Sequence, residues 1–448
     1  MSLPPVFAAS ALYDNLLQAA LRQFFGRATF ETEPIPSLSS DGRLSIEPTN
    51  DPSILSIRWF GTRHVLHVPA RRPFTQHEVR LARAIGTVLA ARYKAIFDPK
   101  QMLERGDLFR GAIEDRYVSA FLEPGAAAGP VQNRADLAAT AIEVLRVAAL
   151  SSYENRSISS GVLLLEGGED PVRHRERPAG GEYHYSQALT GIKSFYRLSD
   201  GLRTLFLVNR DGTVLDIVEV ARYGSPAQLE VPCPIAYRAH ARATLGNRNI
   251  AIVLSPTHEI KILTDGKQVF SFRNAKWNLL DVEAKYEMWA SAVGNRPLAE
   301  RLFQTALDLA DSREGALFVV LRNAAASLSL LVAPGDQLDA LRLFGSEVPT
   351  RAQLMHMLRG RNATELDPAV LEGLARTDGA TVMDGSGRLL AVGAILLHPE
   401  PLEPHSSLAV EGARTTAAMA AGRYGAVLKV SEDGLITFYD EQERIWDI

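Results

Sequence analysis

The amino-acid sequence predicts an α/β fold in which mixed sheets are flanked by helices. Segments with the period of amphipathic helices alternate with short apolar runs rich in β-branched residues. The helix, strand and turn signals of residues 131–280 recur in the same order in residues 281–448. A chain of 448 residues, 46% of them apolar, is long enough for two or three packed cores. We therefore expect two tandem α/β domains preceded by a small α/β module in residues 1–130.

The composition argues against several classes of protein. The formal net charge is -4 and no run of Lys and Arg is long enough to form a basic face, so we expect no nucleic-acid partner. No stretch of about 18 apolar residues occurs, and no basic residue precedes the first apolar stretch, so we expect neither a membrane span nor a secretory signal. These features predict a cytoplasmic protein. The single cysteine, Cys233, is interpreted as a partly buried structural thiol.

Residues 1–130 combine helix and strand signals in a short segment. Residues 11–25 have helical spacing, and residues 54–59 and 64–68 are predicted strands. Thr75 is a predicted N-cap, and Glu78, three residues later, completes a capping box for the helix that follows. Strands that lead into a closing amphipathic helix predict a small sensor-like module.

The two remaining segments look like copies of one another. Each begins with an amphipathic helix, 135–148 in the first copy and 297–310 in the second. Each helix leads into a buried strand, 161–165 or 315–321, and then to an Asp-Gly pair with two further strands around a turn. The third matching element runs from Arg238 to Ser255 in the first copy and from Arg414 to Ser431 in the second, without a gap. Three elements in the same order favour duplication over chance.

The second copy resembles the diadenylate cyclase domain, a bacterial family that joins two ATP molecules into cyclic di-AMP. The family has a Gly-Ala-Leu strand, an Asp-Gly-Ala triplet, a Gly-Thr-Arg-His-Arg-Ala-Ala box that opens a helix, and a strand ending in Ser-Glu. Their counterparts here are G-A-L-F-V-V-L from Gly315, Asp378-Gly379-Ala380, G-A-R-T-T-A-A from Gly412, and V-S-E-D-G from Val430. The family's Thr-Arg-His-Arg is replaced by Ala413-Arg414-Thr415-Thr416, so only the first Arg is kept.

The first copy departs further from the family pattern. Its Asp200-Gly201 pair is followed by Leu202, and the stretch that corresponds to the helix-opening box is R-A-H-A-R from Arg238. We interpret residues 131–280 as a degenerate copy that acts as a sensor.

The resemblance implies a nucleotidyltransferase site in the second copy, with Mg²⁺ or Mn²⁺ as cofactor and ATP as substrate. Asp378, Gly379 and Ala380 would form its catalytic part. The expected ATP- and phosphate-binding residues are Gly412, Arg414, Thr415, Thr416 and Ser431. Asp378 and Glu432 are the expected metal ligands. Because two nucleotide sites must face each other, the resemblance also implies self-association or an internal pseudo-dimer of the two copies.

Three functions remain open from the sequence. The first is an active cyclase, which the complete Asp-Gly-Ala triplet favours. The second is an inactive nucleotide-binding sensor, because the two threonines lack the charge of the family's box. The third is a structural, assembly-forming protein, in which Asp378-Gly379 is only a turn into a strand. An active enzyme would need a compensating cation, and Arg388, Arg423 or a residue of the first copy are the candidates.

Overall fold

A computed structural model of the chain describes residues 5–25, 28–35, 44–47, 49–68, 72–123, 134–153, 156–166, 183–192, 194–339, 351–397 and 412–448. The chain forms two compact units. Unit 1 consists of Met1–Leu229 and Tyr237–Asp281, and unit 2 of Glu230–Ala236 and Val282–Ile448. The units divide between Asp281 and Val282, and Glu230–Ala236 belongs to unit 2 although it precedes that division. None of the helices in the described part of the chain is long and apolar enough to cross a bilayer.

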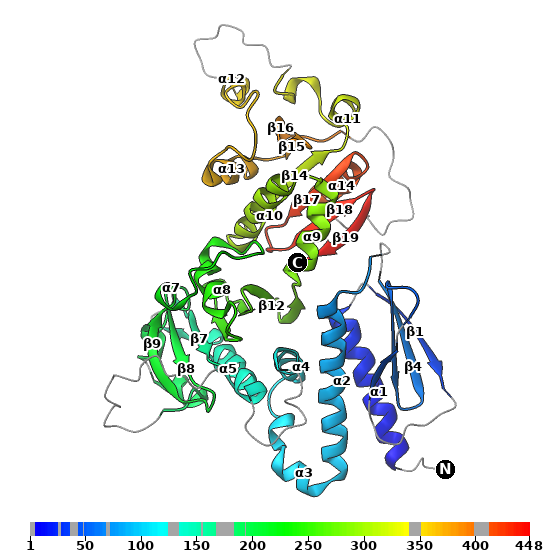
Figure 1. The fold of residues 1–448 in the computed structure, drawn as a ribbon, viewed down its shortest axis with the longest axis vertical. Coiled ribbons are helices and arrows are strands. Elements are labelled where there is room, and N and C mark those ends of the chain that lie inside the picture. The colour runs from blue at the N-terminus through cyan, green and yellow to red at the C-terminus, as the bar shows by residue number, and fades with distance from the viewer. Residues whose placement is uncertain are drawn as a thin grey trace. The chain divides into compact units, whose positions relative to one another are not determined.

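The N-terminal part of unit 1 is a four-stranded antiparallel sheet with helices along it. The sheet has the order β1-β4-β3-β2, formed by β1 (Thr29–Pro34), β2 (Ser45–Glu47), β3 (Ile54–Trp59) and β4 (Thr62–His67). Figure 1 shows α1 (Pro5–Phe24) and α2 (Gln76–Phe97) side by side along this sheet. The predicted capping box is confirmed, since Thr75 and Glu78 each accept a hydrogen bond from the other's backbone N–H. Two shorter helices follow, α3 (Pro99–Glu104) and α4 (Ile113–Leu122).

The first copy, also in unit 1, contains a seven-stranded mixed sheet of order β13-β12-β11-β10-β7-β8-β9. Its strands are β7 (Ser160–Leu164), β8 (Thr204–Val208), β9 (Val214–Glu219), β10 (Ile250–Leu254), β11 (Ile260–Thr264), β12 (Lys267–Arg273) and β13 (Lys276–Leu279). The remaining elements are α5 (Arg134–Ala149), β5 (Ser152–Tyr153), β6 (Arg156–Ser157), α6 (Phe195–Leu198), α7 (Val220–Tyr223) and α8 (Arg238–Thr244). One apolar core runs from Tyr13 in α1 to Trp277 in β13, so the N-terminal module and the first copy pack as one body.

Unit 2 contains a six-stranded mixed sheet of order β16-β15-β14-β17-β18-β19. Its strands are β14 (Ala316–Leu321), β15 (Ala380–Asp384), β16 (Leu389–Ala394), β17 (Gly425–Val430), β18 (Ile436–Asp440) and β19 (Glu443–Asp447). Its helices are α9 (Val282–Val293), α10 (Arg296–Asp311), α11 (Ala324–Leu331), α12 (Arg351–His356), α13 (Pro368–Ala375) and α14 (Ala413–Gly422).

The two large sheets share one topology. In the first copy, β7 pairs in parallel with β8 and antiparallel with β10, the strand that follows the Arg-containing helix α8. In the second copy, β14 pairs in the same way with β15 and with β17, which follows α14. The turns also match. The N–H of Ser255 donates to the carbonyl of Glu259, and that of Ser431 donates to Leu435. This correspondence supports the predicted duplication and confirms the α/β class with mixed sheets.

The sheet of unit 2 is covered on both faces. On one face, Leu317, Val319 and Val427 pack with Ala418 and Ala421 of α14. Because side chains alternate along a strand, the neighbouring residues point to the other face. There the rings of Phe438 and Trp446 pack against Trp289 of α9 and Phe303 of α10. The apolar faces of the strands are thus buried, and polar residues gather at the strand ends.

Candidate active site

Strand register brings the predicted site residues of unit 2 to one edge of the sheet. Phe318 of β14 pairs with Thr381 of β15 in parallel, and Ala316 pairs with Val430 of β17 in antiparallel. The residues that precede β14 and β15 therefore meet the residues that follow β17. Neighbouring strands are about 4.8 Å apart, so Asp378, Gly315 and Ser431 come from strand ends that lie within about 10 Å. The structure thus gathers three motifs, each more than fifty residues from the next in sequence.

Gly379 is required by its backbone geometry. Its φ is +103°, a region that residues with a β-carbon rarely adopt. A β-carbon there would also lie 2.5 Å from the carbonyl carbon of Gly393 and 2.6 Å from the carbonyl oxygen of Ala394. The glycine therefore allows the chain to turn into β15 directly against β16. Ala380, the next residue, is buried and pairs with Ala394, so its side chain packs inside the sheet.

Asp378 is presented to solvent at this edge. The residue is exposed, and among the described residues its carboxylate has no hydrogen bond or salt bridge. A carboxylate in this setting is available to a hydroxyl group or a cation.

Arg414 lies beside the same edge, near the start of α14. Its guanidinium covers Gly315, because a β-carbon built on Gly315 would overlap Nη1 of Arg414. Nη1 is also 3.6 Å from Oε1 of Glu432, and the two side chains are 34% and 77% exposed. Gly412, the N-cap of α14, is exposed, and no side chain in the described part of the chain caps the helix. The N–H groups of Ala413 and Arg414 therefore have no partner among the described residues and could bind an anion, whereas that of Thr415 donates to the carbonyl of Gly412.

The two threonines of the altered box differ in their surroundings. Thr415 is 7% exposed, and its hydroxyl accepts a hydrogen bond of 2.7 Å from Nζ of Lys429 in β17. Thr416 is half-buried, and its N–H lies 3.3 Å from the carbonyl oxygen of Gly412. Lys429, which the sequence argument did not single out, therefore brings a cation next to the box.

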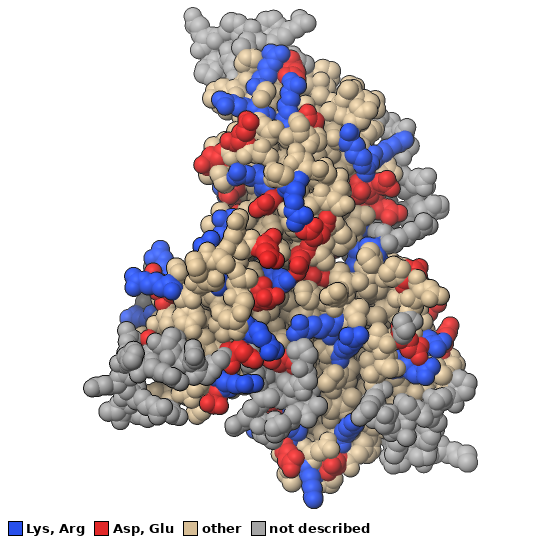
Figure 2. All heavy atoms as spheres, in the orientation of Figure 1, with Lys and Arg blue, Asp and Glu red and all other residues tan. Residues whose placement is uncertain are grey.

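Two further arginines flank the edge. Arg376, two residues before Asp378, forms a salt bridge with Glu314, and Arg313 donates a hydrogen bond of 2.9 Å to the backbone carbonyl of Asp433. Both arginines could have been identified from the sequence, because each lies next to a predicted site motif. On the face of the molecule shown in Figure 2, acidic and basic side chains are interspersed rather than segregated.

The compensating cations proposed from the sequence lie elsewhere. Arg388 lies in the β15–β16 hairpin at the opposite end of β15, where it pairs with Asp339 at 2.6 Å. Arg423 follows the C-terminal end of α14, nine residues beyond Arg414. A helix rises about 1.5 Å per residue, so Arg423 is roughly 13 Å away along the helix axis. Neither of these two candidates therefore lies at the edge.

In the first copy, the equivalent acidic residue, Asp200, is hydrogen-bonded within its own loop. The Asp200 carboxylate accepts hydrogen bonds from the N–H groups of Leu202, Arg203 and Thr204 in its own loop. Burial raises the pKa of Asp200, but these backbone hydrogen bonds outweigh it and hold the pKa below the usual value. The acidic group is thus already satisfied by its own chain.

A buried histidine completes this closure. Gapless alignment of the two copies matches His240 with Thr416. His240 is fully buried, and its Nε2 lies 2.8 Å from the carbonyl oxygen of Gly201. Burial lowers the pKa of His240 to about 4, so the ring is neutral at pH 7 and packs as part of the core. The first copy therefore has a neutral, buried histidine where the second has the half-buried Thr416.

Comparisons with known proteins give limited matches. No family model matches the chain, and no curated protein matches it. Solved structures that resemble part of it include the following two. A hypothetical membrane-spanning protein from Bacillus cereus is 19% identical over 33% of this chain and 61% of that one, with a TM-score of 0.23. DacA from Staphylococcus aureus, in a form with two introduced cysteines, is 18% identical over 34% of this chain and 86% of that one, also with a TM-score of 0.23.

Proposed function

We propose that unit 2 binds ATP at the edge formed by Asp378, Gly379 and Arg414, and that it is a diadenylate cyclase-like nucleotidyltransferase. The observation that carries this proposal is the contrast between the two copies. Asp378 and Asp200 are both exposed, but the Asp378 carboxylate makes no hydrogen bond with any described residue. The Asp200 carboxylate instead accepts hydrogen bonds from the N–H groups of its own loop, and His240 lies against Gly201. The carboxylate of Asp378 is thus available to a ligand, whereas that of Asp200 is engaged by its own backbone.

The residues at this edge suit nucleotidyl transfer. In each of two steps, a ribose 3′-oxygen attacks an α-phosphorus, a new P–O bond forms, and pyrophosphate leaves with the electrons of the broken P–O bond. Asp378 would accept a hydrogen bond from the attacking hydroxyl, whose proton passes to solvent. Arg414 would turn from Glu432 to the phosphate oxygens, assisted by the N–H groups at the start of α14. Catalysis of this kind rests on positioning and charge neutralisation.

The described side chains at this site could supply only some of the ligands that a divalent cation needs. No group of three or more metal-binding side chains occurs among the residues that the structure describes. Mg²⁺ is commonly bound by one or two carboxylates together with substrate phosphates, so the exposed Asp378 is compatible with it. Glu432 is less suited, because its carboxylate lies beside Arg414. When bound, the ion would neutralise charge on the phosphates.

Joining two ATP molecules needs two ATP sites, and under this proposal they come from two chains. The first copy's Asp200 and His240 are engaged internally, so that copy is a poor second ATP site. We therefore favour self-association of two second copies over an internal pseudo-dimer. The first copy and the N-terminal module would then have a regulatory role.

A nucleotide-binding sensor without turnover is the second candidate. It is favoured by the burial of Thr415, which is 7% exposed and bonded to Lys429, so its hydroxyl is poorly placed to contact a phosphate. It is favoured also by the position of Glu432, which competes with phosphate for Arg414. Both candidates share the same ATP site and differ only in chemistry.

Product analysis separates the two candidates. Purified protein is incubated with ATP and either Mg²⁺ or Mn²⁺, and the products are identified by mass spectrometry. The cyclase proposal predicts cyclic di-AMP from the unmodified protein and from Asp200→Asn, and none from Asp378→Asn. Absence of any dinucleotide with either metal would reject the cyclase and leave the sensor. Equal loss in both variants would reject the assignment of the site to the second copy.

A further inference from the structure

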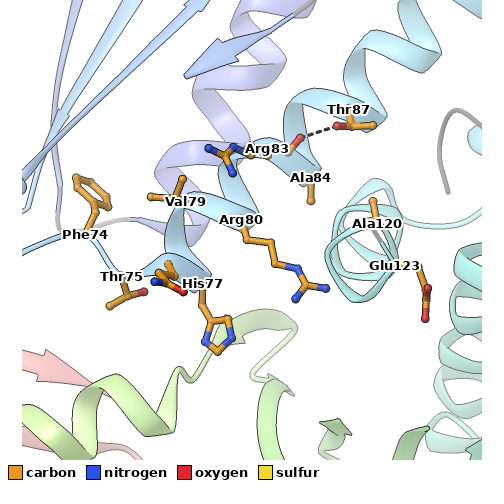
Figure 3. Close-up of a pocket in the computed structure, with 11 residues that line it drawn as sticks. Phe74, Thr75, His77, Val79, Arg80, Arg83, Ala84, Thr87, Ala120 and Glu123 are labelled. Atoms are coloured by element: carbon orange, nitrogen blue, oxygen red, sulfur yellow. Dashed lines mark hydrogen bonds between the residues drawn. The ribbon is translucent and has the colours of Figure 1, made fainter. Parts of the chain in front are cut away.

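Unit 1 contains a cavity that belongs to none of the motifs described above. It has a volume of about 730 Å³ and lies between the first three turns of α2 and the C-terminal end of α4. Figure 3 shows the side chains that line it, with Arg80 reaching from α2 toward α4. Cavities of roughly 300–1,000 Å³ are the size that holds small organic ligands.

One face of α2 forms the cavity wall. His77, Arg80, Ala84 and Thr87 line it and are spaced three or four residues apart, which places them on the same side of the helix. Phe74, Val79 and Ala120 also line it and add apolar surface. The wall thus combines apolar side chains with the nitrogen-bearing side chains of His77 and Arg80.

Positive charge outweighs negative charge in this wall. Of the described lining residues, Arg80 and Arg83 are cationic and Glu123 is the sole acid. Arg83 is exposed, and its guanidinium makes no hydrogen bond or salt bridge with any residue that the structure describes. An anion in the cavity would therefore meet a cation that has no counter-ion of its own.

Arg80 is held in place within the cavity. Its Nη2 donates a hydrogen bond of 3.1 Å to the carbonyl oxygen of Leu122, and its guanidinium carbon lies 4.6 Å from the centre of the Phe121 ring. Burial lowers the pKa of Arg80, with the charge of Glu123 opposing that shift. A half-buried cation of this kind is costly to desolvate, and a bound anion would offset part of that cost.

The start of α2 is already occupied by the protein itself. Glu78 accepts the N–H of Thr75, and both its oxygens are bound by Arg72 at 2.8 and 2.6 Å. His77 is likewise fixed, with Nδ1 2.7 Å from the buried carboxylate of Asp281. The anion-binding capacity of the cavity therefore rests on Arg80 and Arg83 and not on the helix terminus.

We propose that this cavity binds a small organic anion with an apolar body, whose carboxylate, sulfonate or phosphate group contacts Arg80 and Arg83 and whose apolar part contacts Phe74, Val79 and Ala120. The site makes the N-terminal module a small-molecule sensor. It is independent of the ATP site of unit 2, because every lining residue belongs to unit 1.

The probe is 8-anilinonaphthalene-1-sulfonate, titrated into the full-length protein by calorimetry. We expect saturable binding of one molecule per chain, weakened about tenfold or more by Arg80→Met and by Arg83→Met, because each removes a charge-assisted contact. The neutral analogue N-phenyl-1-naphthylamine should bind more weakly, and neither substitution should weaken it further. Arg83 is exposed, so Arg83→Met tests the proposal even where Arg80→Met disturbs folding.

Arg92→Met is the matched control. Arg92 lies on the same helix, donates to the backbone carbonyl of Leu108 at 2.7 Å and lies over the Phe109 ring, but it does not line the cavity. Its substitution should leave the affinity for the sulfonate within twofold of the unmodified protein. The proposal is overturned if binding is not saturable, if Arg92→Met weakens it as much as Arg83→Met, or if the neutral analogue binds as tightly as the sulfonate.

Discussion

The guanidinium of Arg414 lies over Gly315, at the position where any other residue would carry its β-carbon. The contact joins the helix-opening box to the start of the central strand β14. Gly315 therefore gives Arg414 the space to lie at the sheet edge beside Glu432. A residue that the sequence shows only as the first letter of a strand motif thus positions a residue of the proposed site.

Gly315→Ala should weaken ATP binding with little effect on stability. The atom that a new methyl group would meet is the end of a flexible side chain, so Arg414 can move away at low cost. We expect the free energy of unfolding to change by less than about 1 kcal/mol, and ATP affinity to fall about tenfold through the lost charged contact. Calorimetric ATP titration and thermal unfolding measure the two effects. Gly385→Ala, which meets no atom within 4 Å, should change neither.

Gly379→Ala should instead destabilise unit 2. Here the new methyl group meets the backbone of Gly393 and Ala394, and the φ of +103° is unfavourable for alanine. We expect a loss of about 1–3 kcal/mol or more, seen as a lower unfolding temperature. Gly373→Ala in α13 is the control, since it meets no atom within 4 Å and should stabilise its exposed helix by up to about 1 kcal/mol. Equal stability of the two variants would contradict the backbone argument.

We expect the altered box to tolerate an arginine at Thr416 but to be destabilised by a histidine at Thr415. Thr416 is half-buried, so Thr416→Arg should fold and, if the chain is a cyclase, raise the rate of cyclic di-AMP formation about tenfold or more. Thr415 is buried and bonded to Lys429, so Thr415→His should cost about 1–3 kcal/mol of stability by overpacking. Product analysis and thermal unfolding of both variants test this asymmetry. A stable Thr415→His protein would show that the packing around Thr415 is misassigned.

His240 should make unit 1 sensitive to acid. Its pKa is lowered to about 4 in the folded chain, whereas an unfolded histidine titrates near pH 6.5. Between these values the unfolded state binds the extra proton, so stability is complete above about pH 6.5 and falls as the pH drops toward 4, by up to about 1.4 kcal/mol per pH unit. His240→Gln should remove this slope, because glutamine stays neutral and still offers a donor to Gly201. Calorimetric unfolding at several pH values measures it.

The control is the difference in stability between the unmodified protein and His240→Gln above about pH 7.5. It should change little with pH there, because the His240 ring is then neutral in both the folded and the unfolded chain. A slope that survives in His240→Gln would assign the acid sensitivity to other groups.

Much of the fold follows from the sequence. The helices at 135–148 and 297–310 are observed as Arg134–Ala149 and Arg296–Asp311, because their apolar spacing matches the faces they bury. The gapless match from Arg238 to Ser255 and from Arg414 to Ser431 corresponds to equivalent helices, strands and turns. Local periodicity and turn chemistry specify such features without any knowledge of tertiary contacts.

Strand register and side-chain packing could not be predicted in the same way. Arg388 and Arg423 looked suitable because they are cations close to the motifs in sequence, but the hairpin and the length of α14 carry them away from the edge. Lys429 was missed because a single lysine within an apolar strand does not indicate a site in the sequence. Its hydrogen bond to Thr415 is evident only from the structure. The closure of the first copy by His240 depends on burial, which a single sequence does not reveal.

The most direct test of the central claim is the number of ATP sites in each chain. Binding of adenosine 5′-(α,β-methylene)triphosphate with Mg²⁺, which cannot undergo cleavage at the α-phosphorus, is measured by calorimetry for the unmodified protein and for the matched variants Arg414→Met and Arg238→Met. One analogue per chain should bind, with affinity about tenfold lower in Arg414→Met and unchanged in Arg238→Met. Two analogues per chain, or loss of binding in Arg238→Met with Arg414→Met unaffected, would contradict the claim that the second copy alone keeps an open nucleotide site.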